Sequence, residues 1–215
     1  MDYFIIGDIH GCYYTLIEML KNWNHENEYL ILVGDLIDRG NFSAAVVTKC
    51  HELAKKNKNC IILKGNHEFE FVEYFKNGHN QNWIEQCGQK TIDDFQKNKI
   101  DHEQIANWFQ SLPLKFENNT IVVTHAGISE SKNPFDENNM DGVIWNRKEL
   151  KNINKIQIHG HTPILKNEPV FNKLSNSWNI DTGAFYGFGL TGIKINNHGK
   201  IIGKITVETN KKDIA

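Results

Sequence analysis

The sequence has no excess of charge of one sign: 24 lysine and arginine residues stand against 26 aspartate and glutamate residues, for a formal net charge of -2. A chain that binds nucleic acid through a broad basic surface carries a clear positive excess, so we expect no nucleic-acid partner. No apolar stretch approaches the length that spans a membrane, and the run 4–6 is too short for a signal-peptide core. We therefore expect a cytoplasmic protein without a membrane partner.

Cysteine is scarce and shows no paired spacing. The four cysteines, which form no C-x-x-C pair, are Cys12, Cys50, Cys60 and Cys87. This pattern excludes a zinc knuckle and a disulfide framework, and it suits a reducing compartment. We interpret Cys12 as a buried thiol at the start of a helix, with a redox-sensitive thiol near a metal site as the alternative.

Five short motifs stand out, each directly after an apolar run. They are GDIHG at 7–11, GDLIDRG at 34–40, GNHE at 65–68, HAG at 125–127 and HGHTP at 159–163. The preceding runs are typical of β-strands and cover residues 3–6, 29–33, 60–63, 120–123 and 155–158. In open α/β sheets, the carboxyl ends of the strands face one crevice. We therefore expect the polar residues of the motifs to meet there.

The segments between the first strands have apolar residues at helical spacing. Helices are predicted over 13–21, 42–56 and 68–76, which gives a β-α-β-α-β order with parallel strands. Residues 83–110 are predicted to form a small helical subdomain beside the site, and strands dominate from 114 onward. We predict an α/β fold of two stacked mixed β-sheets flanked by helices. It forms a single domain over residues 1–207, followed by a polar, frayed tail over residues 208–215.

The motif residues suit a pair of divalent cations. Six of them are candidate ligands: Asp8, His10, Asp35, Asn66, His125 and His161. If Asp35 bridges the two ions, Asp8 and His10 serve one ion and the other three residues serve the second. Two divalent ions with two aspartates leave a charge of about +2, which suits a phosphate dianion. Mixed carboxylate, amide and imidazole ligands favour manganese, iron or zinc.

Each motif also has a plain structural interpretation. Asp8 could cap the helix that follows it, and Asp35 or Asn66 could form a turn beside glycine. Five motifs in one order, all at strand ends, make this interpretation a poor one. The histidines that lie outside the motifs are interpreted as surface or structural residues: His25, His51, His79, His102 and His198.

Together the motifs resemble those of the PPP-type serine/threonine phosphoprotein phosphatases within the calcineurin-like metallophosphoesterases, above all the small bacterial and bacteriophage branch. The resemblance runs from about residue 4 to about residue 190 and includes Trp83, Gly88, Thr91 and the segment 145–147. It implies the calcineurin-like fold and a di-manganese-type centre held by the six candidate ligands. It also implies a phosphorylated protein or peptide as the substrate, hydrolysed at phosphoserine or phosphothreonine. Cys87-Gly88 departs from the pattern, since relatives usually have two glycines there.

The remaining polar residues of the motifs predict a direct displacement at phosphorus. A hydroxide that bridges the two cations is the expected nucleophile, because no serine or cysteine lies in a nucleophile motif. Arg39 and Arg147 are the expected clamps on the phosphoryl oxygens. His67 is the expected general acid, oriented by Asp38. We place His159 outside the ligand set.

Other functions stay open at this point. A symmetrical diadenosine tetraphosphate hydrolase shares nearly all these motifs, although such relatives are generally longer. A cyclic-nucleotide phosphodiesterase is a second, weaker small-molecule alternative. A non-catalytic scaffold is disfavoured because His67 and Asp38 are both present. The physiological substrate, the native metal and the oligomeric state stay open.

Overall fold

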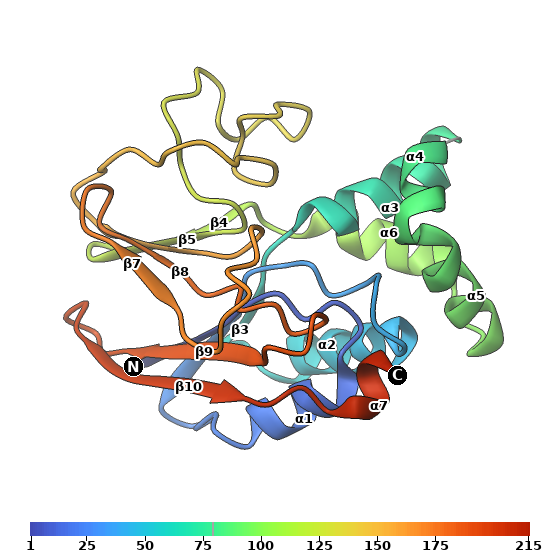
Figure 1. Ribbon diagram of the computed structural model, residues 1–215, viewed down its shortest axis with the longest axis horizontal. Helices are drawn as coiled ribbons and strands as arrows, with labels where there is room; N and C mark the ends of the chain where they lie inside the picture. The colour runs from blue at the N-terminus through green and yellow to red at the C-terminus, as the bar shows by residue number, and fades with distance from the viewer. Residues whose placement is uncertain (79) are drawn as a thin grey trace.

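Two five-stranded mixed sheets lie face to face in the computed structural model, which describes residues 1–78 and 80–215 (Figure 1). His79, interpreted above as a surface or structural residue, lies outside the described residues. The first sheet has the order β10-β9-β1-β2-β3. Its strands are β1 (Asp2–Ile6), β2 (Glu28–Leu32), β3 (Cys60–Ile62), β9 (Leu190–Ile195) and β10 (Ile201–Val207).

The second sheet has the order β4-β5-β6-β8-β7. Its strands are β4 (Lys115–Glu117), β5 (Ile121–Thr124), β6 (Ile156–His159), β7 (Val170–Asn172) and β8 (Ser177–Asn179). Three strands of each sheet are parallel: β1, β2 and β3 in the first, and β5, β6 and β8 in the second. All of them except β8 precede a motif loop. Their carboxyl ends therefore open toward the same region of the molecule.

Helices cover the first sheet and form a lobe at one end of the molecule (Figure 1). Those packed near the sheet are α1 (Tyr13–Leu20) and α2 (Ser43–Lys56). The lobe consists of α3 (Asn66–Asn77), α4 (Gln81–Trp83), the π-helix η1 (Ile84–Gly88), α5 (Gln89–Lys97) and α6 (His102–Ser111). It corresponds to the predicted helical subdomain, extended by α3.

The alternation of side chains along the strands divides the core into two layers. On β1, Ile5 points into the space between the sheets, where it packs with Ile31 and Ile158. Phe4 and Ile6 point to the other face and belong to the larger cluster under the helices. A strand buried on both faces has no polar face, which explains the nearly continuous apolar run before the first motif.

The predicted fold class is confirmed, with differences in detail. The parallel β1-β2-β3 order and the β9-β10 hairpin are both present. Strand β7 escaped prediction because its three residues are exposed at a sheet edge, where burial imposes no alternation. In the described residues, no helix is long and apolar enough to cross a membrane.

The expectation of a frayed tail over residues 208–215 is wrong. Residues Lys211–Ile214 form helix α7, and the side chain of Asp213 is fully buried. Figure 1 shows α7 beside α1, next to the carboxyl end of the chain. Composition alone misled because Asp213 is the one fully buried residue among eight mostly polar ones. The bonds that Asp213 makes are described below.

Candidate active site

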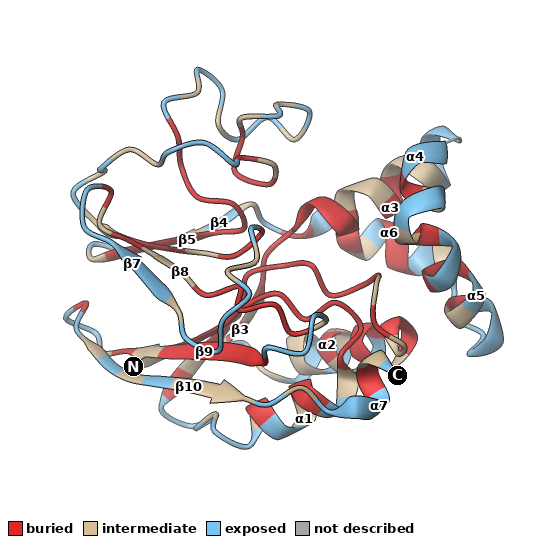
Figure 2. Cartoon of the chain, viewed as in Figure 1, coloured by how far each residue is buried: buried red, intermediate tan, exposed pale blue. Residues whose placement is uncertain are grey.

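The loops that follow the parallel strands of both sheets converge between the two sheets. Figure 2 shows these loops as buried, although loops normally lie at the surface. The close approach of the sheets is visible at Gly160, where a Cβ atom would overlap the carboxylate of Asp8 from the other sheet. Only glycine fits at this position, which accounts for the Gly between the two histidines of the last motif.

The carboxylate of Asp35 lies between two histidines from different sheets. Its Oδ2 atom is 3.5 Å from His10 Nε2 and 3.4 Å from His125 Nε2. Glu68 fixes the loop, because its carboxylate accepts the backbone N–H groups of Asp35 and Leu36, each at 2.8 Å. A carboxylate held between two imidazoles has the position of a ligand that bridges two ions.

A second group of ligand atoms lies on the far side of Asp35. Asn66 Oδ1, His125 Nε2 and His161 Nδ1 form a triangle with edges of 3.1, 3.2 and 2.9 Å. Ligands at right angles with bonds of about 2.1 Å lie about 3.0 Å apart, so the triangle has the dimensions of one face of a coordination sphere. The group therefore fits a divalent cation.

Asp8 gives an independent indication that the centre suits a cation. Its Oδ2 atom accepts the backbone N–H of His161 at 2.9 Å, but its Oδ1 atom is buried and has no hydrogen-bond partner in the described residues. Burial and the neighbouring Asp181 raise the pKa of Asp8 well above its usual value. An unpaired buried carboxylate oxygen is costly, and a bound cation would satisfy it.

Three of the candidate ligands have their second ring nitrogen tied to the backbone. His10 Nδ1 lies 3.0 Å from Ile37 O, His125 Nδ1 lies 3.0 Å from Val33 O, and His161 Nε2 lies 3.1 Å from Trp145 O. A proton on that nitrogen leaves the other one free to ligate, which is the usual arrangement of histidines at metal sites. Each ring is thereby turned toward the centre.

The charge at the centre favours cations. Burial lowers the pKa of His10 to about 3 and that of His161 to about 2, so both rings are neutral near pH 7 and can donate a lone pair. Burial would also lower the pKa of His125, but the carboxylate of Asp35 outweighs it and raises the value to about 9. Without metal ions the aspartates hold a proton on His125, whereas a cation would replace that proton.

His67 and Asp38 form a close pair beside the centre. His67 Nδ1 lies 2.5 Å from Asp38 Oδ2, and the pair is buried. Burial would lower the pKa of His67, but Asp35 and Asp38 hold it well above its usual value. A protonated imidazole next to the candidate metal ligands has the properties of a general acid.

The helical lobe supplies further partners for Asp38. Trp83 Nε1 donates to Asp38 Oδ2 at 2.7 Å, and the Thr91 hydroxyl donates to Oδ1. Cys87 Sγ lies 3.5 Å from Oδ2. These contacts explain two residues that the sequence singled out without a role, while Cys87 was noted only as a departure from the expected glycine.

A cavity of about 390 Å³ opens onto the pair and the metal ligands. Both predicted clamps line it: the partly buried Arg39 and the exposed Arg147, together with Asn66, His67 and His161. Arg39 Nη2 lies 3.5 Å from His67 Nε2, and its Nη1 donates to the hydroxyl of Tyr186. No motif or spacing in the sequence points to Tyr186 as a residue of the site.

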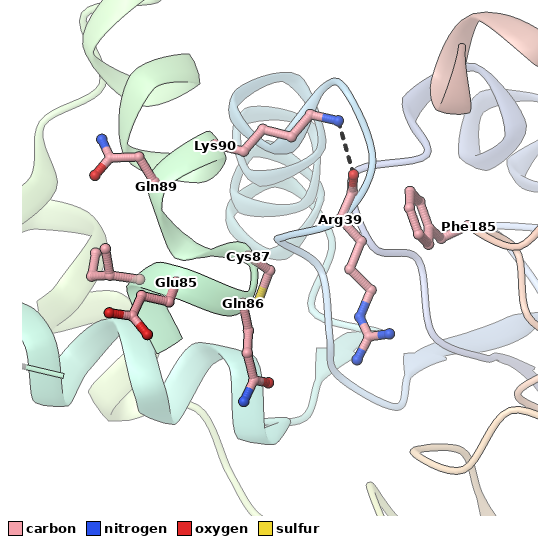
Figure 3. Close-up of a pocket in the computed structure, with 8 residues that line it drawn as sticks. Arg39, Glu85, Gln86, Cys87, Gln89, Lys90 and Phe185 are labelled. Atoms are coloured by element: carbon pink, nitrogen blue, oxygen red, sulfur yellow. Dashed lines mark hydrogen bonds between the residues drawn. The ribbon is translucent and has the colours of Figure 1, made fainter. Parts of the chain in front are cut away.

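A second cavity of about 560 Å³ adjoins the first and shares Arg39 and Cys87 with it (Figure 3). Phe185 and Ile84 give it apolar surface, and Lys90 lies at its edge, where Nζ donates to the carbonyl oxygen of Arg39 at 2.9 Å. His159 lies apart from both cavities, with its Nδ1 3.2 Å from Gly160 O. Burial lowers the pKa of His159 to about 4.

Comparisons with known proteins match most of the chain to phosphoesterases. The family model described as calcineurin-like phosphoesterase matches residues 1–201. A bis(5'-nucleosyl)-tetraphosphatase PrpE (asymmetrical) from Bacillus cereus is 31% identical in a match that covers 90% of this chain and 90% of that protein.

Two solved structures share the fold. A protein provisionally described as a diadenosine tetraphosphatase matches with a TM-score of 0.68 at 19% identity, over 96% of this chain and 93% of that one. A protein serine/threonine phosphatase from Saccharomyces cerevisiae also gives 0.68, at 15% identity, over 98% of this chain and 80% of that one. At such identities the likeness concerns the fold alone.

Proposed function

Because this chain belongs to the calcineurin-like phosphoesterase family, we propose that it is a metal-dependent hydrolase of bis(5'-nucleosyl) tetraphosphates. The similarity to a curated tetraphosphatase, which extends over 90% of both chains, supports this substrate class. A phosphorylated protein, the substrate expected from the motifs, is the second candidate. A solved serine/threonine phosphatase shares only the fold.

The six candidate ligands would hold two divalent cations. Asp8 and His10 would serve the first ion, and Asn66, His125 and His161 the second, with the Asp35 carboxylate between them. Manganese is our first choice, with iron and zinc as alternatives that the same oxygen and nitrogen ligands accept. When bound, such a pair supplies a nucleophile at neutral pH and neutralises charge that develops on the phosphoryl group.

The other residues bind the phosphate chain and move a proton. Arg39 and Arg147 line the same cavity as His67 and present donors to phosphoryl oxygens. His67 Nε2 points to the same region and can protonate a leaving oxygen, while Asp38 holds the opposite ring nitrogen. The two arginines and His67 would together orient the phosphorus–oxygen bond that is broken.

One observation carries the choice of substrate: the two cavities meet at Arg39. A phosphate chain bound at Arg39 can extend in one direction to the metal ligands and in the other into the second cavity. This second cavity, of about 560 Å³, has the size of a small-molecule site, and the ring of Phe185 offers a surface for a nucleobase (Figure 3). A dinucleotide, which has a nucleoside at each end of its phosphate chain, would occupy both cavities.

The test compares substrates on the manganese-loaded protein, with the Asp35→Asn variant as the inactive control. We expect diadenosine tetraphosphate to have a higher kcat/KM than phosphoserine, phosphothreonine and phosphotyrosine peptides or cyclic nucleotides. Chromatography of the products also gives the position of cleavage, since AMP with ATP indicates asymmetrical and ADP alone symmetrical hydrolysis. A higher kcat/KM on a phosphoserine peptide would overturn the proposal in favour of the phosphoprotein.

A further inference from the structure

The carboxyl-terminal segment touches two loops of the candidate site, although it lies outside the region that the family model matches. Helix α7 packs beside the start of α1 and beside the loop after Arg39 (Figure 1). We infer that α7 positions Arg39 for phosphate binding, with Asp213 and Asn41 as the positioning residues. The inference rests on the phosphoesterase function proposed above, but not on the dinucleotide as substrate.

Asp213 caps a helix that lies about 200 residues earlier in the chain. Its carboxylate accepts the backbone N–H of Tyr14 at 3.0 Å, and the N–H and hydroxyl of Thr15 at 2.9 and 2.6 Å. The residue at the normal capping position, Cys12, makes no side-chain cap. An anion at the amino end of a helix satisfies free N–H groups and complements the helix dipole, so α7 is held firmly against α1.

Asn41 connects this anchored segment to the arginine loop. Its backbone N–H donates to Asp213 O, and its Nδ2 donates to Lys212 O and Ala215 O, all at 2.9 Å. Its Oδ1 accepts from Lys90 Nζ at 2.6 Å, and the same ammonium group donates to Arg39 O at 2.9 Å (Figure 3). The tail, Asn41 and Lys90 thus form one chain of bonds that ends on the backbone of Arg39.

The conformation of the loop explains why it needs such support. Asp38 and Arg39 have φ angles of 71° and 65°, in the left-handed region that residues other than glycine rarely adopt. Such conformations persist where the surroundings fix them. The following Gly40 is packed so closely on His10 and Gly11 that a Cβ atom would overlap the backbone. Asp38 is held by the helical lobe, and beyond Arg39 the tail adds its bonds to those that Gly40 and Phe42 make with the first motif loop.

Asn41→Ala is the main test, because Asn41 is partly exposed and its loss leaves the core intact. The probe is inorganic phosphate as an inhibitor of the manganese-loaded enzyme acting on an aryl phosphate. We expect the inhibition constant to rise on the order of tenfold while kcat changes much less, because a displaced clamp weakens binding of the phosphate. Asp213→Ala should act in the same direction. Lys211→Ala is the control, because among the described residues the Lys211 side chain makes no hydrogen bond to the loop.

A double-mutant cycle separates positioning from general stability. In an Arg39→Ala background, Asn41→Ala should have no further effect on the inhibition constant, since the group that it positions is gone. The same tenfold effect in that background, or an unchanged constant in the single variant, would overturn the inference. If the protein does not hydrolyse dinucleotides but the double-mutant cycle gives the expected result, only the proposed substrate is refuted and the positioning role stands. Asn41→Ser, which can keep part of the bonding, should restore part of the affinity.

Discussion

The six candidate metal ligands form one region of the site, and the predicted acid and clamp, His67 with Asp38 and Arg39, form a second region beside it. The two regions are held in place by different parts of the fold. Five of the six metal ligands lie on loops that follow strands, and Asn66 is the first residue of α3. The partners of these ligands are one another or backbone groups of neighbouring loops. His67, Asp38 and Arg39 also follow strands, yet their partners come from the helical lobe, from Tyr186 and from the tail.

The difference assigns separate tasks to the two regions. Strand ends are rigid points of the fold, so ligands placed there keep the spacing that a cation requires. The acid and the arginine meet the substrate, and the elements that hold them can change without moving the metal ligands. We therefore expect variants of the first group to lose metal. Variants of the second group should keep it and change in rate, pH dependence or phosphate affinity.

Asp35→Asn should have the largest effect. An amide at position 35 loses the negative charge between His10 and His125, so the bridge between the two ions weakens. We expect less bound metal and a loss of turnover of about 10³-fold or more. Elemental analysis and a rate assay check this together. Full metal content with normal activity would contradict the bridging role.

His67→Asn should have the next largest effect, and it should depend on the leaving group. A serine alkoxide is strongly basic and needs a proton, whereas a nitrophenolate leaves readily without one. We expect the variant to lose about 10²-fold more rate on a phosphoserine peptide than on an aryl phosphate, with its metal content unchanged.

The same variant also bears on the proposed substrate. A nucleotide that leaves from a phosphate chain carries a phosphate with a second pKa of about 6, so it needs little help from an acid. We therefore expect the loss on diadenosine tetraphosphate to resemble that on the aryl phosphate. Equal losses on all three substrates would move His67 from acid catalysis to substrate positioning or metal support.

Asp38→Asn should change the pH dependence more than the maximal rate. His67 works as an acid while it is protonated, so activity is present below its pKa and is lost as pH rises through that value. Burial favours the neutral ring, and the carboxylates of Asp35 and Asp38 raise the pKa. Without the charge at position 38, the basic limb on a phosphoserine peptide should move to lower pH. A shift of one pH unit costs about tenfold in rate on that limb. An unmoved limb would mean that Asp38 only orients the ring.

The two regions also differ in how much of them the sequence predicts. Asp8, His10 and Asp35 lie within a few residues of a strand end, so local patterns and the geometry of parallel strands suffice to bring them together. The bonds of Asp38 to Trp83 and Thr91 depend on how the helical lobe packs against the loop after β2. The local spacing of residues does not predict this packing. Asp213 is the extreme case: one buried carboxylate in a polar tail has no periodic pattern, and its partners lie at the other end of the chain.

Trp83→Phe should have the smallest effect and gives the finest test of the difference between the regions. Phenylalanine keeps most of the ring that packs against Gly88 but lacks the indole N–H that donates to Asp38 at 2.7 Å. The Thr91 hydroxyl still holds the other carboxylate oxygen, so Asp38 stays in place and becomes slightly more basic. A more basic Asp38 stabilises the protonated ring of His67, so the Nε2 atom gives its proton to the leaving oxygen less readily. We expect a loss of about threefold on a phosphoserine peptide, near the low end of what one hydrogen bond contributes, because the bond from Thr91 is kept. The rate on an aryl phosphate and the metal content should be unchanged. If Trp83→Phe instead releases metal, the part of the helical lobe that follows α3 supports both regions, and the separation of their tasks is wrong.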